Sequence, residues 1–235
     1  TPKPSSAASD VYKRQSVKGT AMANIDFLKT KDINRHNIAF LQYGNTMHFV
    51  VTNLNDPIVS YDNRTNFVDK MIINPYSDRT CPCGRRGCVE SELTPSATMS
   101  KLREVFSAEK TPFLYEAARG SFENVNQDMI TMAYEKDDKA VKEILNGELT
   151  LLAVLLNNLY FSTNPQKIVL HQFKFQNEKA FQKLKDAVTE IGGALVSSKI
   201  ELSIIEDKHR FLSGCALAIR ELFFNRGGFD TSSNN

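Results

Sequence analysis

The densest group of chemically capable side chains is the segment CPCGRRGCVE, residues 81–90. Its three cysteines fall within eight residues, and cysteine thiolates are preferred ligands of zinc. Gly84 and Gly87 lie between the second and third cysteines, where glycine lets the backbone bend tightly enough to gather three sulfurs around one ion. Three cysteines cannot all pair with one another, so this spacing favours a metal over disulfides. The predicted metal ligands are Cys81, Cys83 and Cys88.

Two further features of the cysteines bear on their chemistry. Arg85 and Arg86 add positive charge beside the sulfurs, which favours the thiolate form. A tetrahedral zinc ion would need a fourth donor that this segment does not identify. The remaining cysteine, Cys215, lies in an apolar helical run and is expected to be a small buried side chain. We therefore expect a reducing, cytoplasmic setting.

The segments around the cysteines predict an α/β layer. Residues 21–42 suggest a short strand or loop followed by a helix, and residues 47–52 (MHFVVT) and 67–74 suggest strands. From Pro95 onward the apolar residues recur at helical spacing. The predicted helices are 96–106, 126–135, 139–146, 148–161, 177–191 and 211–224, with strands at 167–171 and 200–205. This alternation indicates mostly parallel strand pairing.

Composition limits the class of protein. A chain of 235 residues that is 41% hydrophobic and 24% charged can form one large domain or two lobes. A net charge of +2 is too small to indicate nucleic-acid binding by itself. The best apolar run, 149–159, is interrupted by two asparagines and falls short of the roughly 20 residues of a membrane span. No membrane association is expected.

The cysteine segment resembles a known family motif. CPCGRRGCVE is similar at every fixed position to the zinc motif CxCGxxGCxE of the ROK family (repressor, open reading frame, kinase). Weaker resemblances extend the match to KDIN (31–34), LNNLYFSTNPQKIVL (156–170) and GCALAIRELFF (214–224). The resemblance implies an α/β, actin-like sugar-kinase (ribonuclease H-like) fold, with an incomplete N-terminal lobe and a helix-rich C-terminal lobe.

The resemblance also implies roles for individual residues. The three cysteines would be zinc ligands, and Glu90 would stand where the family's glutamate touches a sugar hydroxyl. Asp32 would match the general base of the kinases, and Asn34 the second asparagine of the same segment. Two simpler interpretations stay open: Asp32 could cap a helix, and Glu90 could be a solvated loop acid.

The chain departs from the family pattern at the fourth zinc ligand. In the family this ligand is a histidine in an ExGH segment, ten residues before the first cysteine. Here that position is Met71, and the glutamate's position is Val68. A thioether is a poor zinc donor. His48 or His36 could complete the site only if the fold brings one of them close.

The phosphate-binding elements of the kinases also lack counterparts. Glycine-rich turns let backbone amides approach phosphates closely. Residues 50–67 contain no glycine, and HQFKF (171–175) stands where the family usually has glycines after a strand. The family's DxGxT segment is absent too. This chain alone is therefore predicted to bind neither ATP nor DNA well.

These observations predict a four-part organisation and two candidate functions. We expect residues 1–15, which resemble a translated adapter sequence, to be non-native; residues 16–94 to be a partial N-terminal lobe; 95–225 a C-terminal α/β lobe; and 226–235 a disordered tail. The favoured function is the sugar-responsive sensing and dimerisation portion of a bacterial ROK transcriptional regulator. Its ligand would be a sugar or sugar phosphate, its assembly a homodimer, and DNA binding would need a separate N-terminal domain. The alternative is a sugar kinase that uses ATP and Mg²⁺, with Asp32 as base.

Overall fold

The computed structural model describes residues 38–44, 47–52, 68–171 and 178–203. Several predictions lie outside these ranges. They are the positions of Asp32, Asn34, His36 and Cys215, the helix at 211–224, and both terminal segments.

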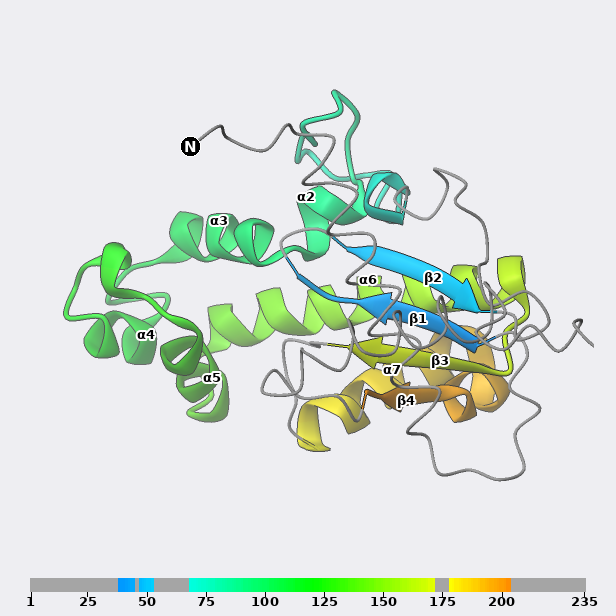
Figure 1. Ribbon diagram of the computed structural model, residues 1–235. Coiled ribbons are helices and arrows are strands. Elements are labelled where there is room, and N and C mark those ends of the chain that lie inside the picture. Colours follow the sequence, from blue (N-terminus) through cyan, green and yellow to red (C-terminus); the bar gives the residue numbers. More distant parts are fainter. Residues whose placement is uncertain (1–37, 45–46, 53–67, 172–177, 204–235) are drawn as a thin grey trace, which may run out of the picture.

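Four strands form one mixed sheet (Figure 1). They are β1 (Ile38–Gln42), β2 (His48–Thr52), β3 (Lys167–His171) and β4 (Ile200–Leu202), in the order β2-β1-β3-β4. β1 runs antiparallel to β2 and parallel to β3, and β3 runs parallel to β4. The sheet thus pairs strands that lie more than a hundred residues apart in the sequence. The predicted α/β class and the strands expected at 47–52 and 167–171 are confirmed, and of the strand expected at 200–205 the structure shows residues 200–202, with residues 204–205 outside the described ranges.

Strand β1 corrects one prediction, because residues 38–42 were expected to belong to a helix. Ile38 and Phe40 point to one face of the sheet, and Ala39 and Leu41 point to the other. All four side chains are buried. A strand that is buried on both faces has a continuous apolar run, and periodicity cannot distinguish such a run from a piece of helix.

Six helices accompany the sheet in the described part of the chain. They are α2 (Val89–Leu93), α3 (Pro95–Val105), α4 (Pro112–Ala117), α5 (Gln127–Glu135), α6 (Lys139–Thr163) and α7 (Glu178–Ser198). Two of them begin at side-chain caps: Thr94 accepts a hydrogen bond from the amide of Ala97 at 3.3 Å, and Asn126 accepts one from Met129 at 3.0 Å. The strand predicted in residues 67–74 is wrong. A 3₁₀ turn, η2 (Val68–Lys70), stands there, followed by one bridge between Ile72 and Cys88.

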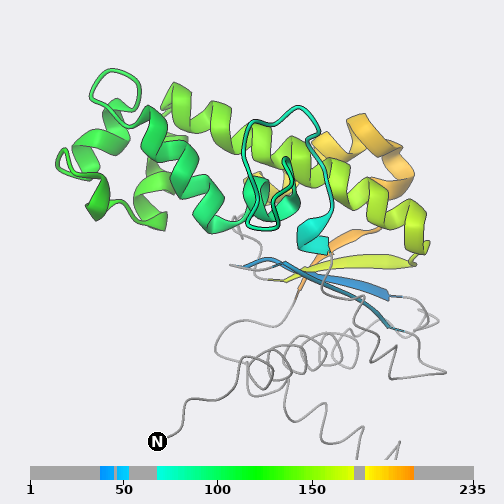
Figure 2. The ribbon, with the colours of Figure 1, turned by 90° about the horizontal axis from the view of Figure 1, so that it is seen from above.

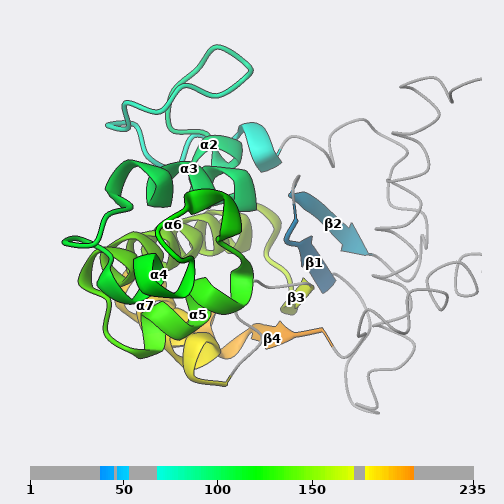
Figure 3. The same ribbon diagram turned by 90° about the vertical axis from the view of Figure 1, so that its left-hand side faces the viewer.

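Helix α6 is the central helix of the fold. It is continuous over 25 residues, although two helices were predicted, because Gly147 lies on its exposed side and does not interrupt it. Figure 2 shows α6 and α7 on one face of the sheet, and Figure 3 shows α3, α4 and α5 gathered near the N-terminal half of α6. The chief buried apolar residues of α6 are Val141, Leu145, Leu149, Leu152, Leu155, Leu156 and Leu159. They join the large core cluster that also contains Ala39 and Leu41 of β1.

Length and composition alone would allow α6 to cross a membrane, and no other described helix meets that test. Half of its most apolar window is buried inside the protein, as expected for the core helix of a globular fold. The helix ends at Asn164, whose left-handed backbone (φ +42°) caps it before Pro165.

Helix α7 bends at the predicted break. Gly193 has φ +80° and ψ 168°, values outside the helical region, and the chain then resumes a helical course to Ser198. Only glycine adopts such a conformation without strain. The break was therefore correctly predicted at Gly192-Gly193, whereas the helical turn that follows it was not.

Candidate metal centre and the adjoining polar hollow

The cysteine loop is a folded hairpin between η2 and α2. Cys81 donates its amide to the carbonyl of Arg85 at 2.7 Å, and Gly84 donates to Cys81 at 2.8 Å. Gly84 and Gly87 both have positive φ, at +83° and +66°. A Cβ on Gly87 would lie 1.7 Å from the carbonyl oxygen of Asn74, so the two arms of the hairpin approach too closely for any other residue. Gly84 and Gly87 therefore allow the tight bend of the backbone that the sequence predicted.

The hairpin brings the three cysteine sulfurs together. The Sγ atoms of Cys81, Cys83 and Cys88 all lie within 4.8 Å of one another, and those of Cys83 and Cys88 are 3.7 Å apart. Tetrahedral zinc with Zn–S bonds of about 2.3 Å requires sulfurs about 3.8 Å apart. The three sulfurs therefore fit a metal ion of this size. Cys81 and Cys88 are buried, whereas Cys83 is exposed, so the cluster opens to solvent on one side.

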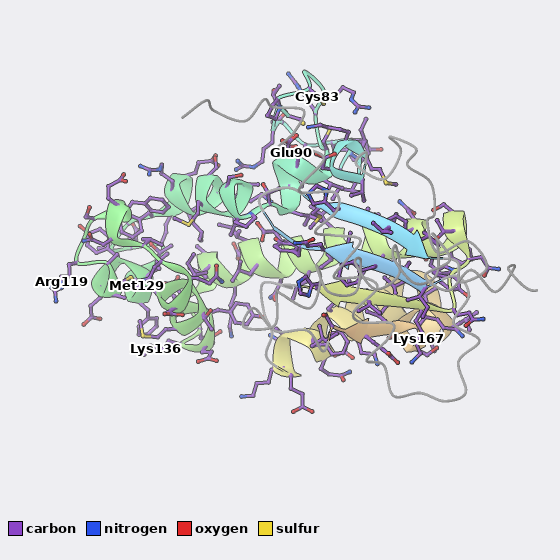
Figure 4. All side chains as sticks on the ribbon, viewed as in Figure 1. Cys83, Glu90, Arg119, Met129, Lys136 and Lys167 are labelled. Carbon is purple, nitrogen blue, oxygen red and sulfur yellow. The ribbon has the colours of Figure 1, made fainter. Side chains whose placement is uncertain are left out.

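Glu90, in the first turn of α2, lies at the edge of this cluster (Figure 4). The thiol of Cys81 donates to its Oε2 atom at 3.1 Å, and the ammonium group of Lys70 contacts the same oxygen. Burial acts to raise the pKa of Glu90, but the hydrogen bonds from Lys70 and Cys81 outweigh it and lower the pKa. The carboxylate is therefore ionised and shared between a cation and a thiol.

The three cysteines differ in their acidity. Hydrogen bonds from Arg85, whose Nε lies 3.5 Å from the sulfur, lower the pKa of Cys83 to about 6. Burial, reinforced by the neighbouring Glu90 carboxylate, raises the pKa of Cys81 to about 12. Burial also raises the pKa of Cys88. Without a cation, one sulfur is thus a thiolate and two are thiols, and a bound metal would favour deprotonation of the other two.

Neither position named by the family pattern faces the sulfurs as a ligand. Val68 is buried in the core, and Met71 packs against that core from a half-buried position. Between them, Lys70 reaches Glu90 instead. Among the described residues, the metal-capable group contains the three cysteines and no histidine. His48 acts on the pKa of Asp69 but is not part of the sulfur group.

Sequence reasoning missed Asp69 and Lys70. Asp69 is buried, its Oδ2 lies 3.6 Å from the Lys70 ammonium, and its Oδ1 has no hydrogen-bond partner among the residues that the structure describes. Burial is the main cause of its raised pKa. The only signal in the sequence was an adjacent acid–base pair at the two middle positions of the expected ExGH segment, and such pairs are common on protein surfaces.

An open hollow of about 830 Å³ adjoins the cysteine loop. Its polar walls include Asn74, Ser77, Arg79, Glu90, Ser91 and Glu104. Oε1 of Glu90 accepts no hydrogen bond from the residues that the structure describes, so one acceptor of this wall residue stays available.

Below the hollow, a buried ionic network holds α2 against α3 and α6. Lys101 donates to the backbone carbonyl of Glu92 at 2.6 Å and lies 3.4 Å from the carboxylates of both Glu92 and Glu148. Thr98 donates to Glu148, at 2.8 Å from the nearer oxygen. Both carboxylates are at most 5% exposed, so each needs this cation.

At the carboxyl ends of β1 and β3, where α/β folds commonly bind ligands, the described residues include several buried bulky side chains. The amide of Tyr43, just after β1, donates at 2.8 Å to the carbonyl of His171, the last residue of β3. Tyr43, Met47 and His171 are all buried. The ring of His171 bonds to Ser203 at 2.9 Å. Bulky side chains thus fill this part of the sheet edge.

Comparisons with known proteins agree with this architecture. The chain is similar to a ROK family transcriptional regulator homologous to the E. coli MLC protein (17% identity, TM-score 0.66), covering 88% of this chain and 51% of that one. It is also similar to a ROK hexokinase from Thermus thermophilus (12% identity, TM-score 0.64), covering 88% of this chain and 65% of that one. A third similar structure is a putative N-acetylmannosamine kinase from Listeria monocytogenes (13% identity, TM-score 0.67), covering 88% of this chain and 64% of that one.

The chain therefore spans about half to two thirds of the length of these solved structures, which share its fold. A comparison with curated protein sequences finds no match. The ROK family model matches residues 69–208, which is more than half of the chain and includes the cysteine loop, the buried network and the α6–α7 layer. The predicted actin-like sugar-kinase fold is confirmed, and the chain belongs to the ROK family.

Proposed function

We propose that this chain is the sugar-sensing and dimerisation portion of a ROK-family transcriptional regulator, without kinase activity. Regulators and sugar kinases of the family share the fold at similar TM-scores, so the proposal depends on this chain's own residues. The observation that carries it is the packed sheet edge at Tyr43, Met47 and His171. Phosphoryl transfer needs backbone amides and cations placed around phosphates. Three buried bulky side chains are poorly suited to that task.

The ligand is proposed to be a sugar or sugar phosphate bound at the polar hollow. Hydroxyl-rich ligands need convergent acceptors and donors, and carboxylates together with Asn, Ser and Arg side chains supply both. Glu90 is the proposed sugar contact, because it lines the hollow and keeps one acceptor oxygen available. Asn34 is proposed as a second contact from the family pattern alone.

Zinc is the proposed metal of the cysteine cluster. Three thiolates select soft or borderline cations, and the spacing of the sulfurs suits tetrahedral zinc. In this role the metal is structural: it would stabilise the hairpin that carries Glu90 at the rim of the hollow. DNA binding would require another domain, and a homodimer is proposed by analogy with the family.

A sugar kinase is the second candidate, with Asp32 as general base and ATP with Mg²⁺ as cosubstrates. The likeness to the hexokinase and to a Streptomyces griseus glucokinase in complex with glucose and AMPPNP favours it. Against it stand the packed sheet edge and the lack of glycine in residues 50–67.

Two measurements on the full chain separate these functions. In a coupled assay for ADP release with glucose and N-acetylmannosamine, we expect no ATP turnover above background and no effect of Asp32→Asn. In calorimetric titrations with the same sugars, we expect binding that Glu90→Ala weakens about tenfold, a typical cost of losing one charged hydrogen bond, whereas Glu123→Gln, which changes an exposed carboxylate outside the hollow, leaves it unchanged. Turnover abolished by Asp32→Asn would overturn the regulator assignment.

A further inference from the structure

Three sulfurs leave one position of a tetrahedral zinc ion to be filled, and the described residues place a carboxylate oxygen beside one of the sulfurs. Oε2 of Glu90 lies 3.1 Å from the sulfur of Cys81. Zinc bonded to sulfur at about 2.3 Å and to a carboxylate oxygen at about 2.0 Å holds those two atoms about 3.5 Å apart. The contact with Cys81 is thus already within the range of a shared metal. The oxygen is not within 4.8 Å of all three sulfurs, so the side chain must turn toward Cys83 and Cys88.

We propose that Glu90 supplies the fourth ligand, so that the site is Cys81, Cys83, Cys88 and one carboxylate oxygen. This inference rests on the zinc site proposed above and adds to it the identity of the ligand that replaces the family's histidine. Glu90 lies two residues after Cys88, at the start of α2, so one short segment of backbone carries both donors.

Ligation requires Glu90 to leave Lys70, and the surroundings of Lys70 permit this. The Lys70–Glu90 pair is partly open to solvent, with side-chain exposures of 29% and 22%, and such pairs are weak. Lys70 has a second carboxylate, Asp69, at 3.6 Å. Within the described part of the chain, Oδ1 of Asp69 is buried without a hydrogen-bond partner, so a stronger contact with Lys70 would satisfy both groups. When Glu90 moves from Lys70 to the metal, both Lys70 and Glu90 therefore keep a partner of opposite charge.

The charge of the filled site is partly offset by a neighbouring cation. Zinc with three thiolates and one carboxylate carries a net charge of −2. Arg85 contacts the sulfur of Cys83 at 3.5 Å and anchors its other end on the carbonyl of Lys70 at 2.9 Å. It thus places one cation beside the cluster, while Lys70 is paired with Asp69. Such a neighbour stabilises an anionic metal site without joining its coordination sphere.

The role of Lys70 distinguishes ligation from a purely structural ion pair. If the Lys70–Glu90 pair only held the loop together, removing either partner would weaken metal binding in the same direction. If Glu90 is a ligand, Lys70 competes with the metal for it. Glu90→Ala then lowers zinc affinity, whereas Lys70→Met leaves it unchanged or raises it.

The test uses the full chain, loaded with Co²⁺ or Zn²⁺ alone. Visible ligand-field bands of bound Co²⁺ report the whole ligand set, and its near-ultraviolet sulfur bands report the thiolates separately. We expect Glu90→Ala to shift the visible bands, while the near-ultraviolet sulfur bands keep the intensity of three thiolates. In competition with a chromogenic chelator, the same variant should bind zinc about tenfold to hundredfold more weakly. Glu104→Gln, which removes another carboxylate from the same hollow, is the matched control and should change neither measurement.

The outcomes separate this inference from the zinc proposal on which it rests. Wild-type protein that binds one Co²⁺ with three thiolates, combined with unchanged visible bands in Glu90→Ala, overturns Glu90 as ligand and leaves zinc in place. Equal losses of affinity in Glu90→Ala and Lys70→Met also overturn it. Wild-type protein with no sulfur bands overturns the metal site itself. Circular dichroism of each metal-free variant checks that the fold is retained.

Discussion

Two glutamates of the same short helix, Glu90 and Glu92, occupy opposite kinds of environment. Both glutamates line the hollow, but Glu90 contacts Lys70 and Cys81 through one oxygen and has 22% of its side chain exposed. Glu92 is 3% exposed and is bonded to Ser77 and paired with Lys101. Two positions along α2 thus separate a carboxylate that can exchange partners from one that is fixed.

This difference indicates how the fold divides its polar groups. The network of Glu92, Lys101 and Glu148 is buried, so losing one member leaves an uncompensated charge, and the network locks α2 to α3 and α6. The group of Glu90, Lys70 and the cysteines lies at the protein's edge, where partners can change at low cost. The buried network therefore fixes the position of α2, and α2 carries Glu90, whose partners can change.

The largest expected effect comes from removing the cation of each group in turn. Lys101→Met should lower the free energy of unfolding by about 3–5 kcal/mol, because two buried carboxylates lose their cation. Lys70→Met should lower it by less than about 1 kcal/mol, because that pair is partly solvated. Urea denaturation followed by circular dichroism measures both in metal-free protein. Similar losses in the two variants would refute the contrast between the two groups.

A smaller effect should separate the two glycines of the cysteine hairpin. Gly87→Ala should cost roughly 3 kcal/mol, because its Cβ would collide with the carbonyl of Asn74 at a positive φ. Gly84→Ala should cost only about 1 kcal/mol. Residue 84 also has a positive φ, which strains alanine, but a Cβ there has nothing within 4 Å. Thermal denaturation of the two variants checks this order, and equal melting temperatures would show that the close approach to Asn74 does not form.

The sequence predicted those parts of the molecule that depend on local chemistry. The hairpin was predictable because cysteine and glycine spacing restricts the backbone directly. Strand β1 was not, since an apolar run such as IAFLQ is compatible with either a helix or a strand, and only its pairing with β3, far along the chain, decides between them. α6 was divided in two because a glycine that faces solvent cannot be distinguished in sequence from one that ends a helix.

The same limit applies to the site. The cysteines were identified as a cluster, but the Lys70–Glu90 and Lys101–Glu92 pairs join residues whose partners depend on how η2, α2 and α3 pack. Charge partners that packing brings together from different elements carry no periodic signal in the sequence. The roles of Asp32 and Asn34 and the proposed lobe boundaries stay predictions, because Asp32 and Asn34 lie outside the described residues and no observation separates the lobes.

The smallest expected effect concerns Glu90 itself and depends on pH. The pKa of Glu90 lies below its ordinary value of 4.5 in the folded protein, so its ionised form stabilises the fold. That contribution is fully present above the ordinary pKa and is lost as the pH falls through the lower folded value. In metal-free protein, Glu90→Gln should therefore be less stable than wild type by up to about 1 kcal/mol at pH 7, and the two should converge as the pH falls through the lowered folded pKa. Urea denaturation at a series of pH values measures the difference. A gap between the two proteins that stays constant down to pH 3 would mean that Glu90 acts through packing rather than through its charge, and the contrast with Glu92 would then lose its electrostatic basis.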